Sequence, residues 1–330
     1  MKILVTGGAG YIGSHAVRRL LQNNYEVIVY DSLINGHKES LPAEAELVVG
    51  DLNDKEKLDK LFKKNNFDAV MHFAAFIEVG ESMKNPAKFY RNNVVNTLNL
   101  LEAMARNNVK KIIFSSTAAL FGYPDKIPIS ESTKKCPVNV YGRTKLMIEQ
   151  MLQDFDAAYG LKFISLRYFN AAGADFGIGE DHNPETHLIP LVLQVALGKR
   201  KEIKIFGTDY STKDGTCIRD YIHVTDLVDA HILALKKLFS TNKSNYYNLG
   251  NGKGYSVKEI IEVARKITGH QIPAIKSKRR AGDPAVLIAD STKIQKELGW
   301  KPKYDLKEII KSAWEWHKNN PNGFEDNINK

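Results

Sequence analysis

A tyrosine and a lysine four residues apart, Tyr141 and Lys145, are well suited to proton transfer. On a helix this spacing places both side chains on one face. An isolated tyrosine has a pKa of about 10, and a neighbouring ammonium favours the phenolate and lowers that pKa. The spacing alone also fits an ordinary helix face with an amphipathic lysine. Hydroxyl groups at Ser115 and Thr117, one strand earlier, favour the catalytic interpretation, because the three kinds of group together can handle a proton.

A glycine-rich turn near the N-terminus, residues 6–13, indicates a dinucleotide site. It satisfies both G-x-x-G-x-x-G and G-x-G-x-x-G between a strand-like run and a helical pattern. Glycines there allow the backbone to approach a pyrophosphate, and the helix N-terminus favours that anion. Asp31 ends the next strand, where a carboxylate meets the adenosine ribose hydroxyls and repels a 2′-phosphate. We therefore predict NAD rather than NADP. The alternative is a plain glycine turn without a ligand.

Other strand ends should meet the same dinucleotide, because ligands of open α/β sheets lie at the carboxyl ends of the strands. Asp51-Leu52 ends the third predicted strand and 73–75 ends the fourth, where small residues let the dinucleotide pass closely. Asp51 could equally cap the helix that follows, and His72 is assigned to the core. A positively charged nicotinamide beside Tyr141 would lower the pKa of its phenol further.

The elements that position these residues are short apolar runs alternating with helical patterns. The strand-like runs are 2–6, 26–30, 46–50, 68–73, 110–115 and 162–167. The helical patterns between most of them are 14–22, 55–64, 93–106 and 141–159. Continuous apolar strands that alternate with helices predict a parallel, doubly wound sheet, with helices on both faces.

The pattern changes after about residue 170, where glycine and proline become denser. A capping box of Ser256 and Glu259 opens a helix at 256–268, and helices are also expected at 291–298 and 306–318.

We therefore predict an α/β fold with two domains. Residues 1–170 form a Rossmann-type NAD-binding domain with a doubly wound parallel sheet. Residues 171–330 form a smaller C-terminal α/β domain that binds the substrate, and segments near 220–250 are open to assignment to either domain.

Composition excludes several classes of protein. With 330 residues, 43% of them hydrophobic and 26% charged, the chain suits one large and one smaller globular domain. No apolar run is long enough to span a bilayer, and the first residues lead straight into a strand, so we expect no signal peptide. Cys136 and Cys217 show no paired or metal-ligand spacing, which predicts a reducing cytoplasm and no metal site. Nucleic-acid binding rests only on the net charge of +9 and is rejected.

Together these motifs resemble the UDP-glucose 4-epimerases of the extended short-chain dehydrogenase/reductase superfamily. The resemblance covers essentially the whole chain and is far more specific than any single motif. Its segments are 6–13, 72–75, 79–82, 141–145, 167–170, 187–190, 215–224 and 279–290. The resemblance implies an NAD-dependent isomerase whose partners are a UDP-sugar and a second copy of the chain, paired through helices such as 93–106 and 141–159.

The resemblance implies a role for each matching residue. Tyr141 removes the proton of the sugar 4-OH, Thr117 bridges that hydroxyl and the phenol, and Lys145 binds the nicotinamide ribose and tunes Tyr141. The implied cofactor contacts are Gly7, Gly10, Tyr11, Ile12, Gly13, Asp31, Asn35, Asp51, Leu52, Phe73, Ala74, Ala75, Asn92, Ser115, Tyr141, Lys145 and Tyr168. The implied substrate contacts are Thr117, Asn170, His187, Leu188, Phe206, Arg219, Tyr221, Arg280, Asp283 and Leu287.

The implied reaction is a transient oxidation at C4. The 4-keto sugar turns over within the pocket, hydride returns to its other face, and NAD stays bound because no net redox change occurs. Three positions depart from the family pattern: Ile77 stands where many relatives have lysine, His187 where some have asparagine, and Leu287 where a bulky aromatic excludes N-acetyl groups. The smaller leucine predicts that UDP-N-acetylhexosamines also fit.

Other activities are weighed against this one. A 4,6-dehydratase of the same fold carries Asp-Glu after the strand-5 threonine, but here Ala118-Ala119 follow, so elimination lacks its acid and base. A 4-epimerase for another UDP-sugar, such as UDP-N-acetylglucosamine or UDP-glucuronate, stays open. A net-redox alcohol dehydrogenase would have no purpose for the UDP-binding residues. A non-catalytic NAD-binding regulator has no physical need for Tyr141 and Lys145.

Overall fold

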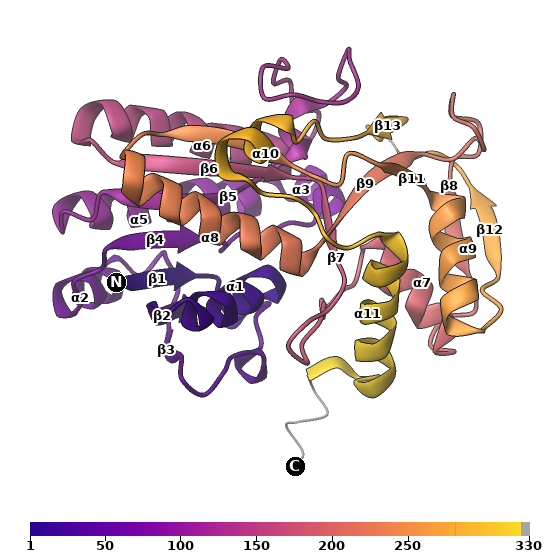
Figure 1. Ribbon diagram of the computed structural model, residues 1–330, viewed down its shortest axis with the longest axis horizontal. Coiled ribbons are helices and arrows are strands. Elements are labelled where there is room, and N and C mark those ends of the chain that lie inside the picture. The colour runs from indigo at the N-terminus through magenta and orange to yellow at the C-terminus, as the bar shows by residue number, and fades with distance from the viewer. Residues whose placement is uncertain (281, 325–330) are drawn as a thin grey trace.

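The computed structural model describes residues 1–280 and 282–324, and within them a seven-stranded parallel sheet forms the main body (Figure 1). Its hydrogen-bonded order is β10-β6-β5-β4-β1-β2-β3. The strands are β1 (Lys2–Thr6), β2 (Glu26–Asp31), β3 (Glu46–Val49), β4 (Ala69–His72), β5 (Lys111–Thr117), β6 (Lys162–Tyr168) and β10 (Asn245–Leu249). The predicted doubly wound sheet is confirmed. The predicted second domain and the motif at 279–290 extend over residues 281 and 325–330, which lie outside the described residues.

Both faces of this sheet are covered, which explains why its strands are continuously apolar. In β1, Ile3 and Val5 pack into one core and Leu4 packs into the other, as the alternation of strand side chains requires. The first core lies under α1 (Tyr11–Gln22), α8 (Val224–Thr241) and α10 (Thr292–Leu298). The second lies under α2 (Lys55–Lys64), α5 (Asn96–Arg106) and α6 (Val140–Tyr159).

Three details at predicted helix starts differ from the structure, the first being that α1 begins at Tyr11 and not at Ser14. The π-helix η2 (Tyr90–Val95) precedes α5, so the segment predicted as one α-helix over 93–106 is divided. Asp54, and not Asp51, caps α2, because its carboxylate accepts a 3.0 Å hydrogen bond from the Lys57 N–H. Asp51 is thereby left at the edge of the sheet.

A second, smaller body lies beyond the carboxyl ends of the strands (Figure 1). In its described part, one sheet combines β7 (Asn170–Ala172), β9 (Ile218–His223), β11 (Gly254–Ser256) and β13 (Val286–Leu287), and a second pairs β8 (Ile203–Phe206) with β12 (Ala274–Ser277). The helices α7 (Leu188–Ala196), α9 (Val257–Thr268) and α11 (Leu306–Asn319) share its apolar core. The predicted capping box of Ser256 and Glu259 opens α9, and Gly269 ends the helix in the left-handed conformation.

The remaining described elements are short and connect the sheet with its helices. They are η1 (Lys38–Ser40), α3 (Val79–Lys84), α4 (Pro86–Phe89) and η3 (Ala118–Phe121). Among the described residues, no helix combines the length and apolar character needed to cross a membrane.

Candidate active site

A cavity of about 440 Å³ lies where the carboxyl ends of the large sheet meet the smaller body. Every predicted cofactor contact lines it. Six predicted substrate contacts line it as well: Thr117, Asn170, His187, Arg219, Asp283 and Leu287. The structure thus gathers residues from both halves of the chain around one space.

Four predicted substrate contacts lie outside the lining of this cavity: Leu188, Phe206, Tyr221 and Arg280. Leu188 and Tyr221 pack in or against the core of the smaller body. The Arg280 guanidinium stacks on the Phe206 ring, with its Cζ atom 4.1 Å from the ring centroid. The roles implied for these four residues stay predictions.

The glycines of the turn are required for two different reasons, packing of the fold and close approach of a ligand. A Cβ atom on Gly7 would lie 2.4 Å from the Ala74 backbone nitrogen, and one on Gly13 would lie 2.1 Å from the Gly7 oxygen, so the fold itself requires both glycines. A Cβ on Gly10 would meet only the Gly7 oxygen, at 3.5 Å. Gly10 is therefore explained by close approach of a ligand in the cavity. Gly10 also precedes α1 without a side-chain cap, which leaves the N–H groups of the first turn for an anion.

Asp31 lies at the end of β2, at the edge of the same cavity. Its carboxylate accepts hydrogen bonds from the Ala9 N–H at 2.9 Å and from the Leu33 N–H at 2.8 Å. Burial raises the pKa of Asp31, while these two backbone hydrogen bonds act in the opposite direction. A bare glycine, an uncapped helix and a fixed carboxylate in one cavity are the groups that fit the pyrophosphate and ribose of a dinucleotide.

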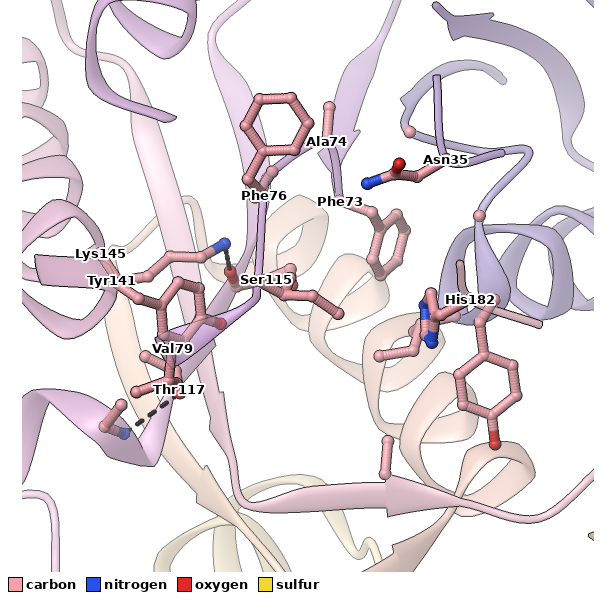
Figure 2. A pocket seen from close by; sticks show the side chains of 18 of the residues that line it. Asn35, Phe73, Ala74, Phe76, Val79, Ser115, Thr117, Tyr141, Lys145 and His182 are labelled. Atoms are coloured by element: carbon pink, nitrogen blue, oxygen red, sulfur yellow. Dashed lines mark hydrogen bonds between the residues drawn. The ribbon is translucent and has the colours of Figure 1, made fainter. Parts of the chain in front are cut away.

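The proton-handling residues gather on the other side of the cavity (Figure 2). Tyr141 and Lys145 come from the first turns of α6, and Ser115 and Thr117 come from the end of β5. The Lys145 Nζ donates a 2.8 Å hydrogen bond to the Ser115 carbonyl oxygen and lies 5.9 Å from the centre of the Tyr141 ring. The Thr117 hydroxyl oxygen accepts from the Ala119 N–H at 3.1 Å, so the threonine proton is directed elsewhere.

The prediction that the pKa of Tyr141 is lowered is wrong for the protein without a bound cofactor. Burial raises the pKa of Tyr141 to about 12, although a hydrogen bond with Thr117 lowers it. Burial also lowers the pKa of Lys145 to about 7, so the lysine is only partly charged near neutral pH. Desolvation disfavours the charged form of both groups, and it is the largest cause of both shifts in pKa. A further positive charge in the cavity is needed to make the phenol a useful base.

Two ion pairs at or near the site were not predicted. Arg167 and Glu149 form a buried ion pair, with Nε–Oε1 and Nη2–Oε2 distances of 2.8 and 2.7 Å, and the Ser116 hydroxyl donates to the same carboxylate. This pair joins β6, β5 and α6, next to the positions that carry Thr117 and Lys145. Arg219 is paired with Asp283, so two predicted substrate contacts hold each other at the cavity wall.

A cluster of two glutamates and two histidines was also not predicted. Glu180, His182, Glu185 and His187 lie close together, and three of them line the cavity. The signal was present in the spacing Glu-x-His-x-x-Glu-x-His, which the expectation of no metal site overlooked.

The model of the NAD dependent epimerase/dehydratase family matches residues 3–250, which is most of the chain. The chain belongs to this family. UDP-glucose 4-epimerase of Halalkalibacterium halodurans is 56% identical over 327 residues, 98% of each chain. A crystal structure of a UDP-glucose 4-epimerase has a TM-score of 0.96 and 54% identity, and the match covers 98% of this chain and 100% of that one. The Bifidobacterium longum enzyme in complex with NAD+ and UDP has a TM-score of 0.93 and 41% identity, with 98% and 100% covered.

This membership confirms the family expected from the motifs, its Rossmann-type fold and its dependence on NAD.

Proposed function

We propose that the protein is a UDP-glucose 4-epimerase that interconverts UDP-glucose and UDP-galactose with bound NAD. One observation carries the proposal: a phenol, a hydroxyl and a lysine lie at the end of β5, in the same cavity as a turn that fits a dinucleotide. The similarity to enzymes of that name over 98% of the chain supports it.

The residues of the chain account for the proton transfer. Tyr141 takes the proton of the sugar 4-OH, and Thr117, whose oxygen already accepts from a backbone N–H, donates toward the phenol. Lys145 is held by the Ser115 carbonyl and positions the ribose next to the phenol. Bound NAD supplies a hydride acceptor at C4 and a positive ring that lowers the pKa of Tyr141.

The second body accounts for retention of the substrate. Arg219 and Asp283 lie at the cavity wall, where a guanidinium suits a diphosphate and a carboxylate suits a uridine or ribose donor. Binding energy from the UDP end retains the keto sugar while the hexose stays free to turn. Arg280, whose guanidinium stacks on the Phe206 ring, is proposed to bind the uridine or the diphosphate.

The residues that line the cavity disfavour elimination of water, the reaction of a 4,6-dehydratase. Ala118 and Ala119 follow Thr117, and the carboxylates that line the described cavity are Asp31, Asp51, Glu180 and Asp283. Asp31 ends β2 and Asp51 follows β3, whereas Thr117 ends β5 and Tyr141 lies in α6. Asp283 is paired with Arg219, and Glu180 lies beside His187. A dehydratase needs an acid and base beside that hydroxyl.

The test is conversion of UDP-galactose to UDP-glucose, followed by chromatography. We expect turnover without added NAD and without accumulation of NADH, which a net-redox dehydrogenase would not show. Tyr141→Phe should lower kcat by about 10²–10⁴-fold, the usual contribution of a general base. Tyr159→Phe is the control, because that tyrosine is exposed at the end of α6. A Tyr141→Phe protein as fast as the parent would end the proposal.

Substrate breadth is proposed to depend on Leu287, which lines the cavity from β13. Leucine fills less space than an aromatic ring, so UDP-N-acetylglucosamine should also be converted. Leu287→Tyr should suppress that reaction while UDP-glucose is still converted. Equal turnover of UDP-N-acetylglucosamine by both proteins would remove Leu287 as the determinant. The same assay with UDP-glucuronate tests the uronate alternative.

We further propose an NAD-binding domain built from residues 1–170 together with α8, β10 and α10, which return to the large sheet and its first core. The other described segments of 171–330 would form the nucleotide-sugar domain, and the protein would be a cytoplasmic homodimer. The exposed apolar side chains Val95 and Met147, beside α5 and on α6, support pairing through these helices. Light scattering should give twice the chain mass, and Met147→Glu should give a monomer. A dimer unchanged by Met147→Glu would place the interface elsewhere.

A further inference from the structure

The loop between β7 and α7 brings two histidine nitrogens and two carboxylates to one point. Glu180, His182, Glu185 and His187 each offer one atom, and these four atoms all lie within 4.8 Å of one another. The Glu180 Oε1 lies 2.9 Å from the His187 Nδ1 and 3.2 Å from the His182 Nδ1. The Glu185 carboxylate lies 3.0 Å from the His187 Nδ1 and 3.7 Å from the His182 Nδ1.

Burial and orientation distinguish this cluster from a surface ion pair. The Glu180 and Glu185 side chains are only 5% and 4% exposed, and buried carboxylates require a compensating charge. His187 makes an aligned hydrogen bond to Glu185. The buried His182 Nδ1, in contrast, makes no hydrogen bond within the described chain, although two carboxylates surround it. A buried ring nitrogen that lies between two carboxylates without an aligned hydrogen bond is a feature that a bound metal ion would satisfy.

We propose that Glu180, His182, Glu185 and His187 bind one divalent transition-metal ion of the zinc type. Two imidazole nitrogens and two carboxylate oxygens are a ligand set that zinc accepts. Metal–ligand bonds of about 2.0–2.1 Å place neighbouring tetrahedral ligands roughly 3.3 Å apart, and the distances of 2.9–3.7 Å bracket this value. Magnesium and calcium prefer all-oxygen sets, so the two imidazoles disfavour them. Two carboxylates and two neutral imidazoles balance the charge of the ion.

The position of the cluster indicates what the ion does. Its loop is attached to the glycine turn, because the Tyr11 hydroxyl donates a 2.7 Å hydrogen bond to the Gly173 oxygen. It is attached to the C-terminal segment, because the Phe324 N–H donates to Asp181 at 2.9 Å. Figure 2 shows His182 across the cavity from Tyr141 and Lys145. The ion therefore holds this wall of the cavity and the start of α7 in place, away from the proton transfer.

The competing interpretation is a metal-free cluster in which protonated histidines neutralise the glutamates. The test is the metal content of the untagged full-length protein, treated with EDTA, supplied with zinc and desalted. We expect about one zinc per chain by mass spectrometry, and visible absorption of a tetrahedral ion when cobalt replaces zinc. EDTA should lower the Tm, and zinc should restore it.

Variants localise the ion. His182→Ala and the conservative His187→Asn should each lose stoichiometric zinc and the response of Tm to EDTA. His270→Ala, which removes an exposed histidine elsewhere, should keep both. The proposal is overturned if the parent binds neither zinc nor cobalt stoichiometrically, or if His187→Asn binds zinc as the parent does. The parent's own metal content decides the question even where a variant does not fold. None of these measurements uses epimerase activity, so they stand apart from the proposed function.

Discussion

Replacing Lys145 by methionine should remove a large pH dependence of stability in the nucleotide-free protein. Burial lowers the pKa of Lys145 from its ordinary 10.5 to about 7. Between these values the unfolded chain binds a proton that the native state does not. The free energy of unfolding therefore rises with pH across this window. Each pKa unit corresponds to about 1.4 kcal/mol, so the buried lysine lowers stability by roughly 4–5 kcal/mol at pH 7, an effect that fades by about pH 10.5.

The assay is equilibrium unfolding in urea at several pH values for the parent and for Lys145→Met. The difference between the two unfolding free energies isolates the lysine, because all other titrating groups cancel. Loss of the hydrogen bond to the Ser115 oxygen adds an offset that changes little with pH, because the neutral amine still has N–H groups that can donate. Lys311→Met is the control, since that lysine is exposed on α11 and should give a flat difference. A flat or falling difference for Lys145 would refute the reasoning that desolvation dominates this site.

Three further predictions concern the cofactor turn and the support behind it. Gly10→Ala should keep the parent's Tm but weaken NAD binding at least about tenfold, measured by calorimetry. Gly13→Ala should lower the Tm, because its Cβ would lie 2.1 Å from a backbone oxygen and would disrupt the turn. Equal changes in Tm for the two variants would contradict this distinction between the glycines. Arg167→Met should lower the unfolding free energy by about 3–5 kcal/mol by leaving Glu149 buried without its partner. Adding Glu149→Leu should recover most of that loss, and no recovery would show that packing dominates. Asp31→Ala should narrow the ratio of NAD to NADP affinity in a fluorescence titration, and an unchanged ratio would exclude Asp31 from that choice.

The parts of the site that follow local rules could be predicted from the sequence. The glycine turn and Asp31 belong to one continuous strand–turn–helix–strand segment. Their spacing depends on neighbouring residues in the sequence and not on how distant segments pack. Tyr141 and Lys145 share a face of α6 because helical periodicity alone determines which side chains are neighbours. The alternation of apolar runs with helical patterns was sufficient to predict the parallel sheet, because strands that are buried on both faces consist mostly of apolar residues.

The parts that depend on burial and distant pairing could not be predicted. The pKa of Tyr141 moves opposite to the expectation because desolvation depends on segments that fold over it, and spacing contains no information on that. The partners Arg219 and Asp283 are 64 residues apart, and Tyr221 belongs to the core of the smaller body.

Sequence by itself thus determined the family and the cofactor, and it placed Tyr141 and Lys145 on one helix face, because these features reside in local backbone geometry and residue type. Tertiary structure decided which of the other candidates line the cavity, which charges neutralise one another and which way the pKa values move. The reason is physical: electrostatic energies and access to a ligand depend on distance and solvent exposure, which the folded chain alone establishes.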